Sequence, residues 1–93
     1  IASVNNIDQI KSVLWPNPVE NSLNITININ YSANYTIELY DLKGVNLKRI
    51  FSGNLGLGDR NINYRTDNLS SGIYIIKISS DIGDYKMIKF IKK

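Results

Sequence analysis

Hydrophobic and polar residues alternate along most of this chain with a period of two. In the cleanest run, four aliphatic residues alternate with polar ones: Leu23, Ile25, Ile27 and Ile29. Successive side chains of a β-strand point to opposite faces, so this run predicts a strand with one buried and one solvated face. Similar runs recur about ten residues apart, and no helical period interrupts them.

Six further runs complete a set of seven short strands: residues 12–15, 35–40, 45–51, 62–64, 73–78 and 85–91. Residues 73–78 are apolar on both faces, which predicts a central strand. Residues 12–15 meet Pro16-Asn17-Pro18, and prolines have no N–H to donate, so we expect an edge strand that ends in a stiff bend. Together the runs predict an all-β fold, a seven-stranded antiparallel β-sandwich with Ig-like or Greek-key character.

Glycine and aspartate mark the turns between these strands. Residues 41–44 predict a hairpin turn in which Gly44 supplies the positive φ. Residues 81–84 predict a tight turn, and residues 53–59, which contain three glycines, a long flexible one. A glycine-rich phosphate-binding loop is disfavoured there, because no strand-loop-helix context and no Lys-Ser/Thr pair follow.

The amino-acid composition then excludes several kinds of catalytic and metal-binding site. The chain has no cysteine and no histidine, which removes thiolate nucleophiles, disulfides, the usual general base and the commonest metal ligand. Most of its aspartates lie in the turns, where they hydrogen-bond their own backbone, and Ser70 and Ser71 have no histidine partner. We therefore predict a protein that is not an enzyme and that has no cofactor or metal.

The net charge of +3 is concentrated at the end of the chain, in Lys86, Lys89, Lys92 and Lys93. No stacking aromatics interleave with these lysines, which disfavours nucleic acid. Residues 85–91 mix apolar and lysine side chains on both faces. Two interpretations stay open: an exposed strand captured by a partner, or an interior strand whose lysine stems lie along apolar surface.

The aromatic residues raise a second possibility, because a sugar-binding sandwich presents planar rings on an outward face. Tyr40 is outward on its predicted strand, and Trp15, Tyr31 and Tyr85 are further candidates for exposure. We favour the interpretation that Trp15 and Tyr74 fill the core, since small β-cores depend on large aromatics for buried area.

Neither a membrane-spanning stretch nor a signal peptide is present, so no membrane insertion is expected. The chain begins with Ile1, which suggests a piece of a larger protein with Lys93 as its natural end. We expect residues 1–12 to be a linker from an upstream domain and residues 13–93 to form the sandwich domain.

Four segments together resemble one family. Residues 14–19, followed by 23–25, are similar to the "YPNPV…L.I" opening of the C-terminal sorting domain (type A) of the Bacteroidetes type IX secretion system, also called the Por secretion system. Residues 37–44 resemble its "I.IYDL.G" hairpin, residues 69–78 its "L.SG.Y..K" segment and residues 86–93 its terminal basic-apolar strand. Departures are small: Trp15 stands where Tyr or Phe is commoner, and Val45-Asn46 replaces a frequent basic residue.

The resemblance implies a non-catalytic sorting domain at the end of a larger cargo protein. Such a cargo crosses the inner membrane by a Sec signal, passes through the periplasm and is recognised by the outer-membrane translocon. A cell-surface sortase then removes the domain, here upstream of Val13, and joins the cargo to anionic lipopolysaccharide, or the cargo is released. The expected location is therefore secreted or at the cell surface.

The residues expected to carry recognition are Pro16, Asn17, Pro18, Gly44, Gly72, Tyr74, Lys77, Lys86, Lys89, Ile91 and Lys92. The prolines and Asn17 shape the opening bend, Gly72 and Tyr74 set the central strand, and only the terminal strand is expected to touch a partner. The alternatives are a carbohydrate-binding or cell-surface adhesion module that uses outward tyrosines, and a plain structural spacer.

Overall fold

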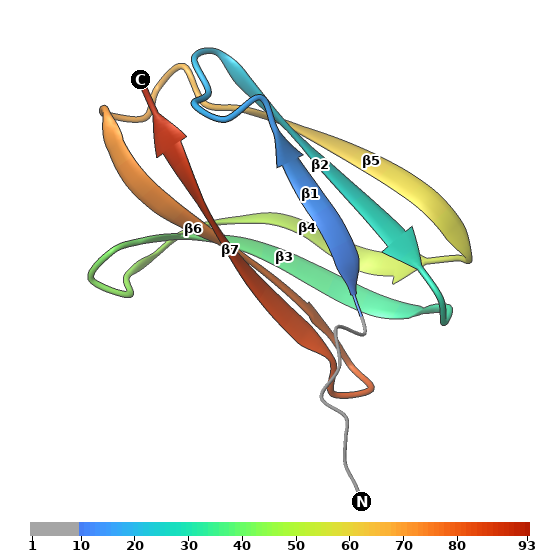
Figure 1. Cartoon of the computed structure of the whole chain (residues 1–93). Helices are drawn as coiled ribbons and strands as arrows, with labels where there is room; N and C mark the ends of the chain where they lie inside the picture. Colours follow the sequence, from blue (N-terminus) through green and yellow to red (C-terminus); the bar gives the residue numbers. More distant parts are fainter. Residues whose placement is uncertain (1–9) are drawn as a thin grey trace, which may run out of the picture.

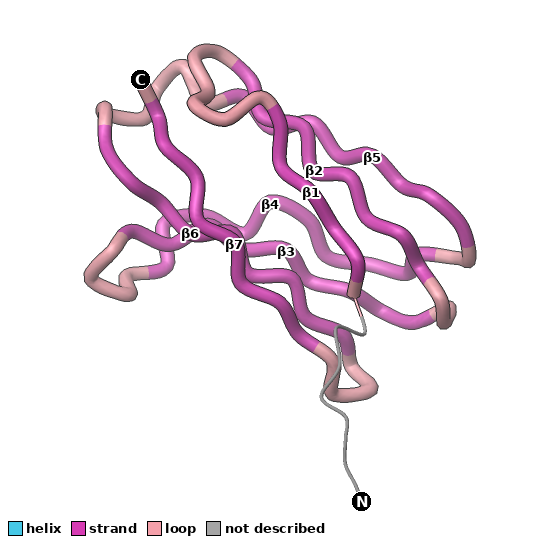
Figure 2. Tube along the Cα trace, in the orientation of Figure 1, coloured by secondary structure: helices cyan, strands magenta, loops and turns pink. Residues whose placement is uncertain are grey.

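The strands predicted by the alternation are all present in the computed structural model, which describes residues 10–93. Residues 1–9, most of the expected linker, lie outside the described residues. Within the described part every regular element is a strand (Figure 2). The seven strands are β1 (Lys11–Trp15), β2 (Ser22–Ile29), β3 (Ala33–Asp41), β4 (Asn46–Leu55), β5 (Gly58–Arg65), β6 (Gly72–Ser80) and β7 (Tyr85–Lys92).

The strands form two layers (Figure 1). One sheet has the order β1-β2-β5 and the other the order β4-β3-β6-β7, and neighbouring strands in each are antiparallel. The prediction of an all-β sandwich is confirmed. The edge position of β1 and the interior position of β6 are confirmed as well.

The terminal strand β7 lies at an edge of the four-stranded sheet. Of the two interpretations left open for residues 85–91, the interior strand is therefore wrong. An edge strand with apolar residues on both faces leaves one of those faces in water here, because no element within residues 10–93 covers the outer side of the sheet.

The core lies between the two layers and is built from the inward positions of the alternating strands. Its β2 members are Leu23, Ile25, Ile27 and Ile29, the four aliphatic residues of the cleanest sequence run, and all are buried. Ile37, Leu39, Ile76 and Ile78 face them from β3 and β6. Each such side chain contributes about 1.5–3 kcal/mol by leaving water, so the period of two determines which face of each sheet becomes the interior.

The N-terminal end of the sandwich begins slightly ahead of residue 13. β1 starts at Lys11, and Ile10 is buried in the core at 2% exposure. Residues 10–12 thus pack with the domain. Where the upstream linker meets the domain remains a prediction.

The predicted hairpin turn at residues 41–44 is confirmed. The Gly44 amide donates to the Asp41 carbonyl oxygen (3.1 Å), and Gly44 has a φ of 88°. The Asp41 carboxylate also accepts from the amides of Lys43 and Val45 (2.9 and 3.0 Å), which is the local bonding expected of a turn aspartate.

Two details of the sequence interpretation are wrong. The turn predicted for residues 53–59 is much shorter, because β4 continues to Leu55, which enters the core, and β5 begins at Gly58. Trp15 does not fill the core. Leu14 takes the inward position on β1, so Trp15 points outward and is 49% exposed, whereas Tyr74 is buried as expected.

Candidate recognition surface

The outward side chains of β7 form one side of an exposed, mostly apolar face. Tyr85, Met87 and Ile91 are exposed, with Met87 at 55% and Ile91 at 47%, and Lys89 lies between them. Phe90 points the other way and is 1% exposed. β7 thus contributes side chains to the core from one face and leaves its other face exposed to water.

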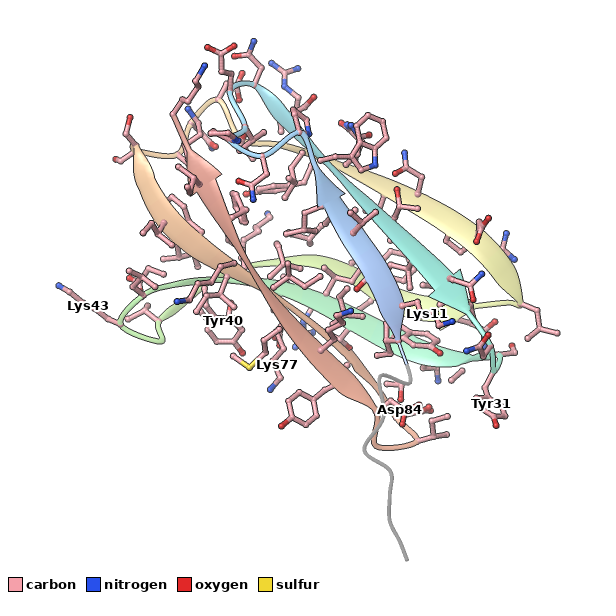
Figure 3. The ribbon with its side chains drawn as sticks, viewed as in Figure 1. Lys11, Tyr31, Tyr40, Lys43, Lys77 and Asp84 are labelled. Atoms are coloured by element: carbon pink, nitrogen blue, oxygen red, sulfur yellow. The ribbon has the colours of Figure 1, made fainter. Side chains whose placement is uncertain are left out.

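The register of β6 against β7 widens this surface. On the outer side of the sheet, Ile73 is opposite Ile91, Ile75 is opposite Lys89, and Lys77 is opposite Met87. Tyr40 of β3 is opposite Ile75 in turn. We name this surface the terminal face, and it consists of Tyr40, Ile73, Ile75, Lys77, Tyr85, Met87, Lys89 and Ile91. Figure 3 shows Tyr40 and Lys77 close together on this sheet, well apart from Lys11 of the other sheet.

The charge of the terminal face comes from Lys77 and Lys89. Glu38 is opposite Lys77 across β3 and β6, but its carboxylate already has other partners. Tyr40 Oη and Asn46 Nδ2 donate to it at 3.3 and 3.0 Å, and Arg49 lies 3.9 Å away. The face therefore combines contiguous apolar side chains with cationic ones.

The proline bend after β1 joins the three-stranded sheet to the end of β7. The Val19 amide donates to the Ile91 carbonyl oxygen (2.8 Å), and the Lys93 amide donates to the Val19 carbonyl oxygen (2.9 Å). The Ile91 amide donates to Asn17 Oδ1 at 2.9 Å. We call this arrangement of residues 17–19 against residues 91–93 the clamp. Figure 1 shows the chain end beside the β1–β2 connection.

The bend itself is well defined. Both the Trp15-Pro16 and the Asn17-Pro18 peptide bonds are cis, and Val19 is fully buried. β1 ends at Trp15, as expected from the prolines, and the segment that follows holds the backbone of β7 along the edge of that strand that is not paired with β6.

Tyr74 and Gly72 occupy the start of β6, next to the clamp. The Tyr74 ring stacks on Phe90 with centroids 5.7 Å apart, and its hydroxyl donates to the Ser70 carbonyl oxygen (2.7 Å). Gly72 is opposite Lys92 and has a φ of 157°. Both residues shape the interior and the strand end, and neither belongs to the terminal face.

The expected recognition residues therefore fall into separate places. The terminal face contains Lys77, Lys89 and Ile91. At the clamp, Asn17 accepts a hydrogen bond from the Ile91 amide, and Pro16 and Pro18 flank Asn17 in the chain. Lys86 and Lys92 occupy the inward-facing positions of β7 and are half-buried, and Gly44 lies in the β3–β4 turn.

The expected recognition residues did not include five members of the terminal face and two of the clamp: Tyr40, Ile73, Ile75, Tyr85, Met87, Val19 and Lys93. Ile73 and Ile75 belong to the terminal face, and the apolar character of residues 73–78 on both faces was the pattern that indicates them. Val19 is the backbone partner of β7, and no local pattern indicates a contact with a residue more than 70 positions away in the chain.

Titratable groups elsewhere have structural surroundings. Burial raises the pKa of Tyr35, and the negative charges of Asp84 and Asp81 raise it further. A hydrogen bond from Arg65, at 2.6 Å, lowers the pKa of Asp67. Among residues 10–93, no group of three or more His, Cys, Asp or Glu could hold a metal ion, and no helix is present that could span a membrane.

Comparisons with known proteins identify the family. No curated protein matches the chain significantly. Among solved structures it is similar to PorZ, an essential bacterial surface component of the type-IX secretion system of Porphyromonas gingivalis. The TM-score is 0.54 at 14% identity over 88% of this chain, and the match covers only 11% of PorZ. That likeness concerns the fold alone. Residues 13–93 match the family described as the secretion system C-terminal sorting domain. The chain therefore belongs to that family and is a C-terminal sorting signal of the type IX secretion system.

Proposed function

We propose that the terminal face is the surface by which the export machinery recognises the folded domain. The observation that supports this most directly is a contrast between the two outer faces of the sandwich. Strands β2 and β5 of the three-stranded sheet expose mainly polar side chains, as the solvated face of an antiparallel sheet normally does. The exposed apolar residues of that outer face are Val13 and Trp15, both on the edge strand β1. The terminal face instead exposes Ile73, Met87 and Ile91 beside two lysines. Contiguous exposed apolar side chains of this kind mark interaction sites.

The clamp supports the same proposal. It holds the backbone of Ile91 and Lys93, so the side chains of β7 are presented from a fixed strand. A fixed strand is an advantage for recognition, because less conformational entropy is lost when a partner binds. Asn17, with Pro16 and Pro18 beside it, positions the terminal strand and does not contact the partner in this proposal.

As a sorting signal, the domain implies a secreted or cell-surface cargo. In the proposal the cargo lies upstream in the same chain and reaches the outer-membrane translocon from the periplasm. A cell-surface sortase then cuts upstream of Ile10, where the packed domain begins, and attaches the cargo to anionic lipopolysaccharide, or the cargo is released. The domain itself contributes recognition and no chemistry.

The alternative of a carbohydrate module based on the outward tyrosines gains no comparable support. Tyr40 is half-buried, and its hydroxyl is bound to Glu38, so its ring is not a free platform. Tyr31 lies beyond the end of β2, and Tyr85 lies at the start of β7.

The test is export of a reporter fused ahead of the domain in a type IX-competent host. Deleting the last eight residues would also remove Phe90 from the core, so the informative variant is Met87→Asp combined with Ile91→Asp. Both side chains are exposed, and we expect secretion to fall at least tenfold, about 1.4 kcal/mol of lost recognition, while thermal unfolding shows a folded domain.

The matched control is Val13→Asp, which also replaces an exposed aliphatic residue but lies on the outer face of the other sheet. It should leave secretion unchanged. Normal secretion of the folded double variant, or an equal loss in the control, would refute the terminal face as the recognised surface.

A further inference from the structure

The outer face of the three-stranded sheet carries a second, chemically different set of side chains. Strand pairing arranges them in three rows across β1, β2 and β5: Lys11–Asn28–Asp59, Val13–Thr26–Asn61 and Trp15–Asn24–Asn63. We name this surface the amide face. Trp15 and Lys11 stand at its two ends along β1, about 13 Å apart at about 3.3 Å per residue.

Hydrogen bonds between the rows hold these side chains in place. The Trp15 indole N–H donates to Thr26 Oγ1 (3.0 Å), and that hydroxyl donates to Asn61 Oδ1 (3.1 Å). The amides of Asn61 and Asn63 both donate to Asn24 Oδ1 (3.3 Å each). The indole is therefore tied by its edge to the neighbouring strand and lies over the sheet, with about half of its surface still in water.

Several polar atoms of the amide face are left available. Within residues 10–93, Asn24 Nδ2, Asn28 Oδ1 and Asn63 Oδ1 have no hydrogen-bond partner. Asn28 Nδ2 donates to one oxygen of Asp59 at 2.8 Å, which leaves the other oxygen open. The charges of Lys11 and Asp59 balance within their row. The surface thus offers fixed donors and acceptors without a net charge.

An open hollow lies at the Lys11 end of this surface. It has a volume of about 280 Å³ and is lined by Lys11, Ser12, Val13, Thr26, Asn28 and Asp59. Val13 is the short side chain next to Lys11 on β1, so the surface is hollowed there, and Trp15 stands two residues further along the same strand. The volume is near the lower end of the range for small-molecule sites, which suits a short segment of a chain-like ligand.

We propose that the amide face binds a neutral oligosaccharide. The apolar C–H side of a sugar ring packs on an exposed indole, and its hydroxyls both donate and accept, which matches the mixture of free amide and carboxylate atoms. A nucleic acid would require an excess of cations, and an apolar protein surface would leave these polar atoms without partners. The site is distinct from the terminal face on the opposite sheet.

The chain contains a single tryptophan, so its fluorescence reports directly on Trp15. The full 93-residue chain is titrated with neutral hexasaccharides of β-1,4-glucose, β-1,3-glucose and β-1,4-mannose, and calorimetry measures the same affinities. We expect a saturable fluorescence change with at least one of them. In calorimetry, Trp15→Ala and the double variant Asn24→Ala/Asn63→Ala should each weaken binding about tenfold or more.

Tyr40→Ala, on the terminal face, is the matched control and should bind as the unaltered chain does. Thermal unfolding of each variant separates lost binding from lost folding, and the double variant keeps a test available if Trp15→Ala does not fold. The proposal is overturned if none of the three hexasaccharides binds the folded chain. It is equally overturned if the Trp15 and asparagine variants bind normally, or if a sulfated polysaccharide binds more tightly with a steep salt dependence.

Discussion

Tyr35 illustrates how a single side chain links the fold to its ionisation state. Its ring is buried, its hydroxyl donates to the Tyr31 carbonyl oxygen (3.0 Å), and burial together with Asp84 and Asp81 raises its pKa. The folded chain therefore keeps this proton at a pH where the unfolded chain has released it. The contribution of Tyr35 to the free energy of unfolding is fully present below about pH 10, the ordinary tyrosine pKa. It is lost as the pH rises through the raised pKa of Tyr35 in the folded chain.

We predict that Tyr35→Phe lowers the free energy of unfolding by about 1 kcal/mol at neutral pH, because one hydrogen bond is lost. Above about pH 10 the difference from the unaltered chain should shrink, since phenylalanine has no proton to release. Urea denaturation of both chains at a series of pH values measures this difference, and lysine titration affects both equally. A difference that stays constant to high pH would contradict the assignment.

At the scale of elements, the clamp is the connection with the clearest consequence. Asn17 Oδ1 is the acceptor for the Ile91 amide, which points away from β6. Asn17→Ala removes that acceptor and should destabilise the end of β7 by about 1 kcal/mol, which corresponds to about fivefold faster hydrogen exchange at the Ile91 amide.

Asn17→Asp retains an acceptor oxygen and should preserve the slow exchange. The Phe90 amide provides an internal reference, because successive N–H groups of a strand alternate in direction and this one faces β6. Exchange at Ile91 that is equally slow in Asn17→Ala would show that the side chain does not hold the strand.

The elements also show what the sequence can and cannot predict. The pattern of apolar and polar residues placed all seven strands, most clearly β2, where burial of one face requires strict alternation. It misjudged residues 53–59, where three glycines indicate a turn but Leu55 is drawn into the core and extends β4. The position of Trp15 was also predicted wrongly. A large aromatic side chain favours burial, but Leu14 points into the core, so its neighbour Trp15 must point outward. The clamp and the terminal face depend on which strands become neighbours, and that is a property of the tertiary fold.

At the scale of the whole molecule, recognition through the terminal face requires that the export machinery binds the folded domain. A chain of this size is only marginally stable, so a single core defect should remove the fold. Phe90 is buried and stacked on Tyr74, and Phe90→Ala should cost about 3–5 kcal/mol. Ile91→Ala, at the next position, removes an exposed side chain and should leave the domain folded.

These two neighbours in β7 distinguish recognition of the fold from recognition of a linear tail. We predict that Phe90→Ala unfolds the domain and abolishes export of a fused reporter, although every residue of the terminal face is still present. A reporter that carries only residues 86–93 should fail for the same reason, whereas one that carries residues 13–93 should be exported. Circular dichroism establishes the folded state, and secretion is measured in the same host. Normal export of the unfolded Phe90→Ala chain would show that the machinery recognises the terminal strand as an unfolded peptide. The sandwich would then serve only to protect that strand before export.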